Sequence, residues 1–356
     1  MMRRIAESGR TVMVLSMMML DMLTPAVRHV GTLGAQGLFR DTTALEVTIE
    51  TDLKAVLRDR DSTKFAPHAS TLTYRDSTGA MKTFPVTLRA RGHFRRQARN
   101  CEFPPLKLEF ARKDAHETLF QGNSTLKITT NCRPSTPDYQ QYILSEYALY
   151  RAYQLVSPKH FRTRLAHITY HDTAKSMGDV VSWAFFIEDV KEVAKKYRLT
   201  VLDTHGALFH DLDDTQLEIT SLFEYMAANT DWSISGLHNI ALMQDSIGRI
   251  QTVAYDFDWS GAVNARYSFP DARLGIKTTT ERLYRGPCRT MAEWQPVLDR
   301  FIAARTRIEA MYESIPAFEA RRKRTVLDYF ADFWKIIGDP KAARHALTDG
   351  CLPQGN

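Results

Sequence analysis

The sequence predicts an α+β protein with a β-rich N-terminal half, built around one long helix, and a mainly helical C-terminal half. Before residue 189, segments that alternate apolar and polar residues or are rich in β-branched ones are typical of strands. After residue 189, the apolar spacing is mostly that of amphipathic helices. The 356 residues allow one large or two medium domains. With 44% hydrophobic and 25% charged residues, the composition is globular and excludes wholesale disorder.

The first half contains the predicted strands and the long helix. The helix is predicted over 138–155, because Tyr142, Ile143, Tyr147 and Tyr150 recur at near-helical spacing. The predicted strands are 44–50, 70–75, 83–90, 105–110, 124–130, 163–170 and 181–188. Together they make a β-rich lobe, 36–189, with one helix inserted.

The second half, 190–356, is predicted as a mainly helical lobe. A helix opens at the capping-box pattern Thr215-x-x-Glu218 and runs into Asn229-Thr230-Asp231. Two strands joined by a short turn follow, at 239–244 and 249–255, and the second ends in Asp256-Phe257-Asp258. Further helices are predicted over 291–314 and 319–347.

The first 35 residues have the layout of a secretory signal peptide. A start with three arginines leads into the uncharged run TVMVLSMMML, and small residues follow up to Ala35. A cytosolic N-terminal helix is the alternative. Because no apolar run reaches about 18 residues, a stable membrane span is not expected. The prediction is a secreted or periplasmic protein.

Four cysteines, an even number, suit an oxidising compartment. The simplest pairing joins Cys101 to Cys132, which flank two predicted strands, and Cys288 to Cys351. Two other pairings, or four buried thiols, remain open. There is no CxxC pair and no HExxH helix, so a zinc site has little support.

The basic residues are concentrated in one stretch. The net charge is +6, and the segment 82–113 holds nine lysines and arginines against only Glu102 and Glu109. This concentration favours a local anion site over a nucleic-acid-binding surface.

Three oxygen-bearing residues are expected to converge near the hairpin. A hairpin brings its two ends together, so Asn239 near its start and Asp256 at its finish can share one metal-ligand shell. Carboxylate and amide oxygens suit Mg²⁺. Asp231 would then orient or deprotonate an incoming hydroxyl. Taken singly, each is a turn former or a solvated strand end.

The cations that phosphoryl transfer needs lie upstream. Lys107 and Lys127 occupy strands just before the long helix, and Glu146 inside that helix is a possible ion-pair partner. Arg91 and Arg95 follow an earlier strand and could bind phosphate through guanidinium forks. Each cation alone is more often a surface residue, but the order of the parts favours a joint site.

At these residues the chain resembles the CotH family of atypical, secreted or spore-coat protein kinases. The matching stretches are Arg91-Gly92 with PPLKLEF, then YILSEYALYRAY, FFIED, NTDWSISGLHN and AYDFDWSG. The resemblance covers about 85–262. It implies a two-lobed protein-kinase-like fold that binds ATP with Mg²⁺ and phosphorylates serine in secreted proteins.

Carried over by this resemblance, Asp231 is the catalytic-loop aspartate and Asn239 the metal-binding amide. Asp256 would hold Mg²⁺ on the nucleotide phosphates, with Asp258 close by. Asn239 is eight residues past Asp231, further than in many relatives, so Ser235 or the backbone is an alternative ligand.

The resemblance also bears on the nucleotide-binding lobe. Lys107 matches the family's lysine better than Lys127 does, although Lys127 better fits the strand directly before the helix. Glu188 falls at the hinge that would meet the adenine.

The expected function is therefore ATP- and Mg²⁺-dependent phosphorylation of a protein substrate in the envelope or extracellular space, without nucleic acid as a partner. A catalytically inactive surface or adhesion module is the alternative from another class. A metal-dependent hydrolase acting on water through the same acidic cluster is a weaker third.

Overall fold

The computed structural model describes residues 37–61 and 63–353. These described residues form one compact unit. The predicted signal peptide, 1–35, lies outside the described residues.

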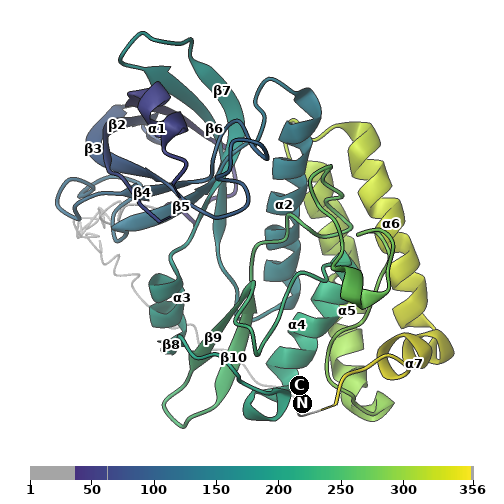
Figure 1. The fold of residues 1–356 in the computed structure, drawn as a ribbon. Coiled ribbons are helices and arrows are strands. Elements are labelled where there is room, and N and C mark those ends of the chain that lie inside the picture. Colours follow the sequence, from purple (N-terminus) through teal and green to yellow (C-terminus); the bar gives the residue numbers. More distant parts are fainter. Residues whose placement is uncertain (1–36, 62, 354–356) are drawn as a thin grey trace, which may run out of the picture. The chain divides into compact units, whose positions relative to one another are not determined.

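Seven strands close into a barrel in the order β1-β2-β3-β4-β5-β7-β6 (Figure 1). The strands are β1 (Leu45–Thr51), β2 (His68–Arg75), β3 (Met81–Ala90), β4 (Leu106–Glu109), β5 (Thr125–Thr129), β6 (Thr163–Asp172) and β7 (Val180–Ile187). Neighbouring strands run antiparallel, except that β1 and β6 run parallel, with Leu45 opposite Ala166. A short helix, α1 (Leu53–Arg58), follows β1.

Alternate residues of each strand fill the barrel and the others face outward. Leu88, Leu108, Leu126 and Phe186 belong to the buried cluster inside it. The residues between them face outward, and Lys107 and Lys127 lie opposite each other on β4 and β5. The alternation of period two that predicts the strands therefore also decides which face each side chain takes.

The prediction of a two-lobed protein-kinase-like fold, with a β-rich N-lobe and a helical C-lobe, is wrong. The strands form a closed seven-stranded barrel of mixed orientation. The barrel closes through the parallel pairing of β1 with β6 and the pairing of β5 with β7. Local patterns predict where strands occur, but they carry no information on which distant strands pair, and that pairing determines the fold.

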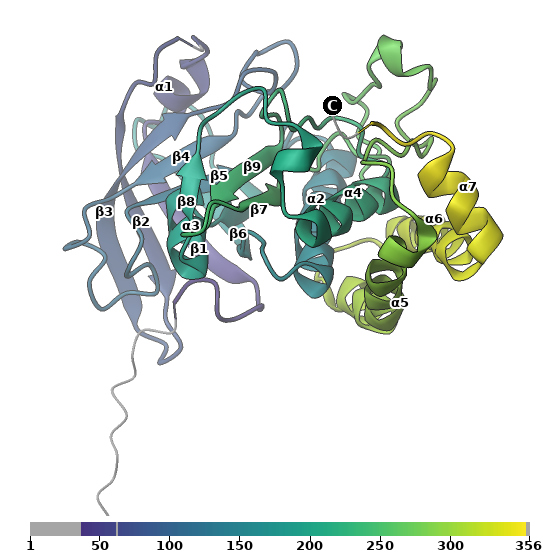
Figure 2. The same ribbon diagram turned by 90° about the horizontal axis from the view of Figure 1, so that it is seen from below.

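A layer of helices packs against one side of the barrel (Figure 2). The long helix α2 (Pro137–Val156) contacts β6 and β7 of the barrel and the helices α4 (Asp214–Ala227) and α5 (Met291–Ser314). Helix α6 (Ala320–Gly338) packs against α4 and α5, and α7 (Pro340–Thr348) packs against α6. The helix predicted over 319–347 is broken, because Pro340 starts a new one that Asp339 caps. Among the described residues, no helix combines the length and apolar character needed to cross a membrane.

A small antiparallel sheet lies beyond the barrel, in the order β10-β9-β8. It consists of β8 (Thr200–Leu202), which follows α3 (Val190–Tyr197), and the hairpin β9 (Ile240–Gln244) and β10 (Ile250–Ala254). The 3₁₀ turns η1 (Phe209–Asp211) and η2 (Ala272–Leu274) lie in the connections before α4 and before α5. The sheet brings both ends of the hairpin close to α2 and the barrel wall.

Both predicted disulfides are confirmed. Cys101 bonds to Cys132 and Cys288 bonds to Cys351, and the described residues contain no free cysteine. The first bridge joins the segment that enters β4 to the one that leaves β5. Two disulfides indicate an oxidising, extracellular-type environment.

Candidate functional site

The loop that follows α4 carries the first of the candidate residues. Helix α4 ends at Ala227 and is capped by Ala228, which has a left-handed backbone with φ of 50° and donates its N–H to main-chain oxygens of the last helical turn. Arg285 then donates from one guanidinium nitrogen to the main-chain oxygens of Thr230, at 2.5 Å, and Trp232, at 2.8 Å. These carbonyls flank Asp231, so Arg285 fixes the backbone on both sides of it.

Two side chains hold the Asp231 carboxylate. The ring Nε2 of His238 lies 3.1 Å from Oδ1, and the amide Nδ2 of Asn239 donates to Oδ2 at 3.1 Å. The same amide donates to the main-chain oxygen of Asp231 at 2.6 Å. The hydrogen bond with Asp231 raises the pKa of His238 above its usual value, against the opposing effect of burial. The loop 231–239 is therefore closed on itself.

The two ends of the hairpin meet beside this loop. The main-chain N–H of Tyr255 donates to the oxygen of Asn239 at 3.0 Å. Both Asn239 and Asp256 have left-handed backbones, with φ of 55° and 65°. Non-glycine residues in this region are uncommon, and they concentrate at functional sites. The main-chain N–H of Asp256 also donates to the hydroxyl of Tyr150 on α2, at 2.8 Å.

Among the described residues, the side-chain oxygens of Asp256 and Asn239 have no protein partner and could bind a metal ion. Among the described residues, the carboxylate of Asp256 accepts no hydrogen bond and forms no ion pair, and the side-chain oxygen of Asn239 is similarly unused. Within the same residues, no group of three or more His, Cys, Asp or Glu is arranged to hold a metal ion. Mg²⁺ needs only one or two carboxylates when waters and substrate phosphates complete its shell. Asp256 and Asn239 therefore fit a magnesium ion that a phosphate shares.

Asp258 occupies a different environment from Asp256. It is buried, accepts a hydrogen bond from the Tyr267 hydroxyl at 3.1 Å, and pairs with Arg95 at 3.5 Å. Burial, with the neighbouring charge of Asp256, raises the pKa of Asp258. Its carboxylate is thus used by protein partners.

Lys127 reaches the site from the barrel wall. It lies on the outward face of β5, and its amine stands 5.3 Å from the centre of the Tyr255 ring. Burial, assisted by the positive charge of Arg91, lowers the pKa of Lys127 from 10.5 to about 8, although Asp256 acts in the opposite direction. A partly desolvated lysine close to an aspartate is typical of an anion-binding site.

Arg91 lies next to this lysine. Its Nε donates to the main-chain oxygen of Leu106 at 3.2 Å. Burial lowers the pKa of Arg91, while the charge of Asp256 opposes that change. Arg91 and Lys127 therefore place two cations near the Asp256 carboxylate.

Arg95, predicted to bind phosphate, is instead surrounded by protein acceptors. It donates to the main-chain oxygen of Thr130 at 2.5 Å and lies 3.8 Å from Glu146 and 3.5 Å from Asp258. Glu146 is buried, and that burial raises its pKa well above the usual value. Glu146, which was predicted to pair with a lysine, therefore pairs with Arg95 instead.

Two residues that were predicted to bind the nucleotide, Lys107 and Glu188, do not lie beside Asp256. Lys107 is half-exposed on the outer face of β4 and pairs with Glu109 at 2.6 Å. Glu188 is buried, and its carboxylate receives Arg162 at 2.5 Å and Lys196 at 2.9 Å. Both charges are used in local ion pairs, so of the two candidate lysines only Lys127 approaches Asp256.

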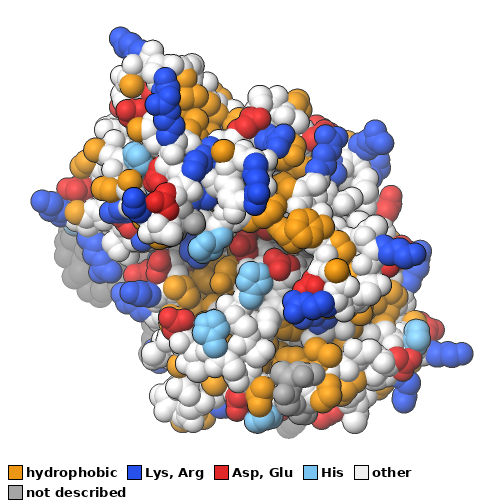
Figure 3. Space-filling view, in the orientation of Figure 1, with side chains coloured by type: hydrophobic (Ala, Val, Ile, Leu, Met, Phe, Trp, Pro, Cys, Tyr) orange, Lys and Arg blue, Asp and Glu red, His pale blue; other side chains and the backbone are white. Residues whose placement is uncertain are grey.

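Sequence reasoning did not identify several residues that shape the site. His238 directly precedes Asn239, and its place next to a candidate ligand was an available signal. Tyr150 was assigned only to the apolar face of its helix, and Arg285 and Tyr267 lie far along the chain with no local motif. Figure 3 shows acidic and histidine side chains gathered near the middle of one face, with lysines and arginines above them.

Neither a protein-family model nor a curated protein sequence matches the chain.

Proposed function

We propose that this protein is an ATP- and Mg²⁺-dependent phosphotransferase of the CotH type, which moves the γ-phosphoryl group to a hydroxyl of an extracytoplasmic protein. The observation that carries the proposal is the meeting of Asp231, Asn239 and Asp256 with Lys127. These residues come from a loop, both ends of a hairpin and the barrel wall. Carboxylates beside a desolvated cation are what phosphoryl transfer requires.

Asp231 takes the role of the proton acceptor. Its carboxylate is held by His238 and Asn239, and its backbone is held by Arg285 on both sides. A carboxylate fixed in this way orients the hydroxyl of the acceptor and receives its proton as the oxygen attacks phosphorus.

Lys127 and Arg91 compensate the negative charge of the phosphates. Both are substantially removed from water, so their attraction for an anion is stronger than that of a solvated lysine or arginine. Phosphate binding would also restore full protonation of Lys127, because a nearby anion favours the charged amine.

Asp256 and the side-chain oxygen of Asn239 are the residues that would hold Mg²⁺. The ion would supply positive charge that offsets the negative charge of the phosphates. The unpartnered state of these two oxygens among the described residues supports this assignment.

The compartment indicates where the acceptor protein is found. The two disulfides support an acceptor protein in the envelope or extracellular space. A secretory signal at 1–35 is part of this proposal.

Transfer of ³²P from γ-labelled ATP to a mixture of envelope proteins, with Mg²⁺, tests the proposal. The variant Asp231→Asn keeps the size of the side chain but removes the base, and a loss on the order of 10²-fold or more is expected. Asp203→Asn is the matched control, since Asp203 is an exposed aspartate of the loop after β8. Equal labelling by wild type and Asp231→Asn would contradict the role of Asp231.

The same experiment separates the alternatives. Release of labelled phosphate without any labelled protein would indicate a metal-dependent hydrolase. Absence of both labelling and ATP binding would favour a binding module without catalytic activity.

A further inference from the structure

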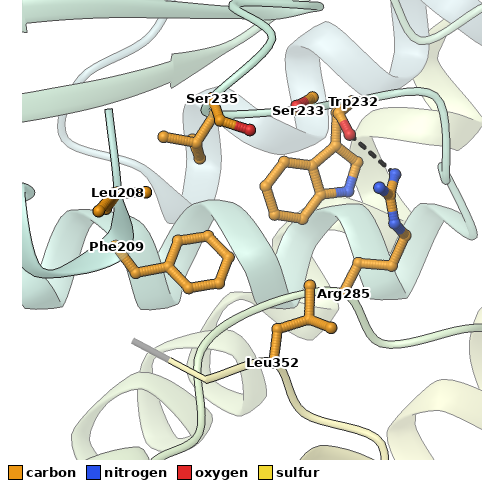
Figure 4. A pocket seen from close by; sticks show the side chains of 8 residues that line it. Leu208, Phe209, Trp232, Ser233, Ser235, Arg285 and Leu352 are labelled. Atoms are coloured by element: carbon orange, nitrogen blue, oxygen red, sulfur yellow. Dashed lines mark hydrogen bonds between the residues drawn. The ribbon is translucent and has the colours of Figure 1, made fainter. Parts of the chain in front are cut away.

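A pocket of about 380 Å³ is lined in part by residues 232–235, the start of the loop that follows Asp231 (Figure 4). Its walls include Leu208 and Phe209, which precede α4, together with Trp232, Arg285 and Leu352. The proposed transfer mechanism uses none of this volume.

The pocket is directly connected to the proposed base. Trp232 follows Asp231 in the chain, and Arg285 bonds to the carbonyls on either side of Asp231. A polypeptide in extended form advances about 3.3 Å per residue. Because Trp232 is both the neighbour of Asp231 and part of the pocket wall, a residue close to the hydroxyl of a substrate held at Asp231 can place its side chain in this pocket.

Two side chains with unpaired donors line the pocket. Trp232 is only 4% exposed, yet among the described residues its indole N–H has no hydrogen-bond partner. Arg285 bonds to the main chain through one terminal nitrogen, which leaves its Nε and other terminal nitrogen without a partner in the same part of the chain. None of these nitrogens is fully enclosed by protein, so they can donate to an acceptor that enters the pocket.

Three carboxylates act on the charge of Arg285, and each has another role. Asp231 is the proposed base, Asp271 also pairs with Arg273, and Glu224 is fully buried with its pKa raised well above the usual value by that burial. No acidic side chain lines the pocket among the described residues. A guanidinium and an indole N–H on one wall match a carboxylate, which accepts from both.

We propose that this pocket binds an acidic side chain of the acceptor polypeptide, within two residues of the hydroxyl that is phosphorylated. The carboxylate accepts from Trp232 and Arg285, and its hydrocarbon stem packs on Phe209 and Leu352. That the bound peptide is a phosphate acceptor rests on the proposed function. That the pocket binds an acidic side chain does not depend on it.

Synthetic peptides with one serine test the specificity. Glutamate is placed at each position within two residues of the serine and compared with glutamine, which has the same shape without the charge. At one position kcat/KM for the glutamate peptide should exceed that for the glutamine peptide by about tenfold, typical of a charged hydrogen-bonded contact. In Trp232→Phe, which keeps an aromatic ring but removes the N–H, this ratio should fall to about threefold or less.

Trp183→Phe is the matched control. Trp183 is a half-buried tryptophan on β7 that stacks on His167, on the outer face of the barrel. Its removal should leave the glutamate-to-glutamine ratio as in the wild type. An equal fall in both variants would contradict the assignment to this pocket.

Calorimetric binding of the same peptides without ATP separates this inference from the proposed function. If no phosphate is transferred but the glutamate peptide binds wild type more tightly than Trp232→Phe, the pocket assignment stands and the kinase proposal fails. If phosphate is transferred with equal efficiency to both peptides, the pocket assignment is overturned and the kinase proposal stands.

Discussion

Lys127 provides the sharpest prediction, because its pKa falls inside an accessible pH range. Burial lowers that pKa from 10.5 to about 8. Binding of an anionic nucleotide needs the charged amine. Above pH 8 the free protein loses this proton, so the affinity for ATP should fall by up to about tenfold for each further pH unit. The affinity stops falling at the pH at which Lys127 also loses its proton in the nucleotide-bound protein.

The same shift affects stability with a defined sign. Between pH 8 and 10.5 the unfolded chain holds a proton on this lysine that the folded chain has released. The free energy of unfolding should therefore rise with pH across this window, by up to about 3 kcal/mol, as the cost of burying the charge disappears. Below pH 8 that cost is present in full.

The assay is calorimetric titration of ATP with Mg²⁺ from pH 6.5 to 10 at constant ionic strength. Lys127→Arg should bind without the fall above pH 8, because a guanidinium stays charged. Lys107→Met is the matched control, since Lys107 lies opposite Lys127 on the neighbouring strand but pairs with Glu109. A pH profile that changes in Lys107→Met and not in Lys127→Arg would refute this reasoning.

Three further predictions concern stability and metal dependence. Replacing Cys101 and Cys132 by serine should lower the free energy of unfolding, measured with urea, by about 4 kcal/mol. The disulfide joins residues 31 apart in sequence, and without it the unfolded chain gains conformational entropy. Gly261→Ala should destabilise by several kcal/mol, because the new methyl group meets the backbone of Thr279–Thr280, whereas Gly178→Ala, with open space around it, should have little effect in the same assay. Asp256→Asn should weaken the Mg²⁺ dependence of ATP binding, seen as a smaller metal-induced rise in melting temperature; an unchanged rise would exclude this carboxylate as a ligand.

Strands and helices were the predictable part of the fold. The alternation in 83–90 and 124–130, and the near-helical spacing in 138–155, follow from burial on one face, and the structure has elements at all three places. Helix α3 and strand β8 were missed, because eight residues make little more than two helical turns and three residues show hardly any alternation. Barrel closure was missed because the register between β1 and β6 depends on contacts between segments far apart in the chain.

The candidate site was predictable where it is local. A hairpin forces its ends together, so the proximity of Asn239 and Asp256 followed from turn chemistry alone. The choice between Lys107 and Lys127 could not be made, because both lie on the outward face and only the position of β10 relative to the barrel distinguishes them. The partners of Arg95 depend on the packing of α2, which no sequence pattern specifies.

A crystal structure with Mn²⁺ and a non-hydrolysable ATP analogue tests the central claim most directly. Mn²⁺ replaces Mg²⁺ and is located by its anomalous scattering. We expect the metal about 2.1 Å from a carboxylate oxygen of Asp256. We also expect the amine of Lys127 in hydrogen-bond contact with a phosphate oxygen. A nucleotide bound elsewhere, or a metal held without Asp256, would contradict the account.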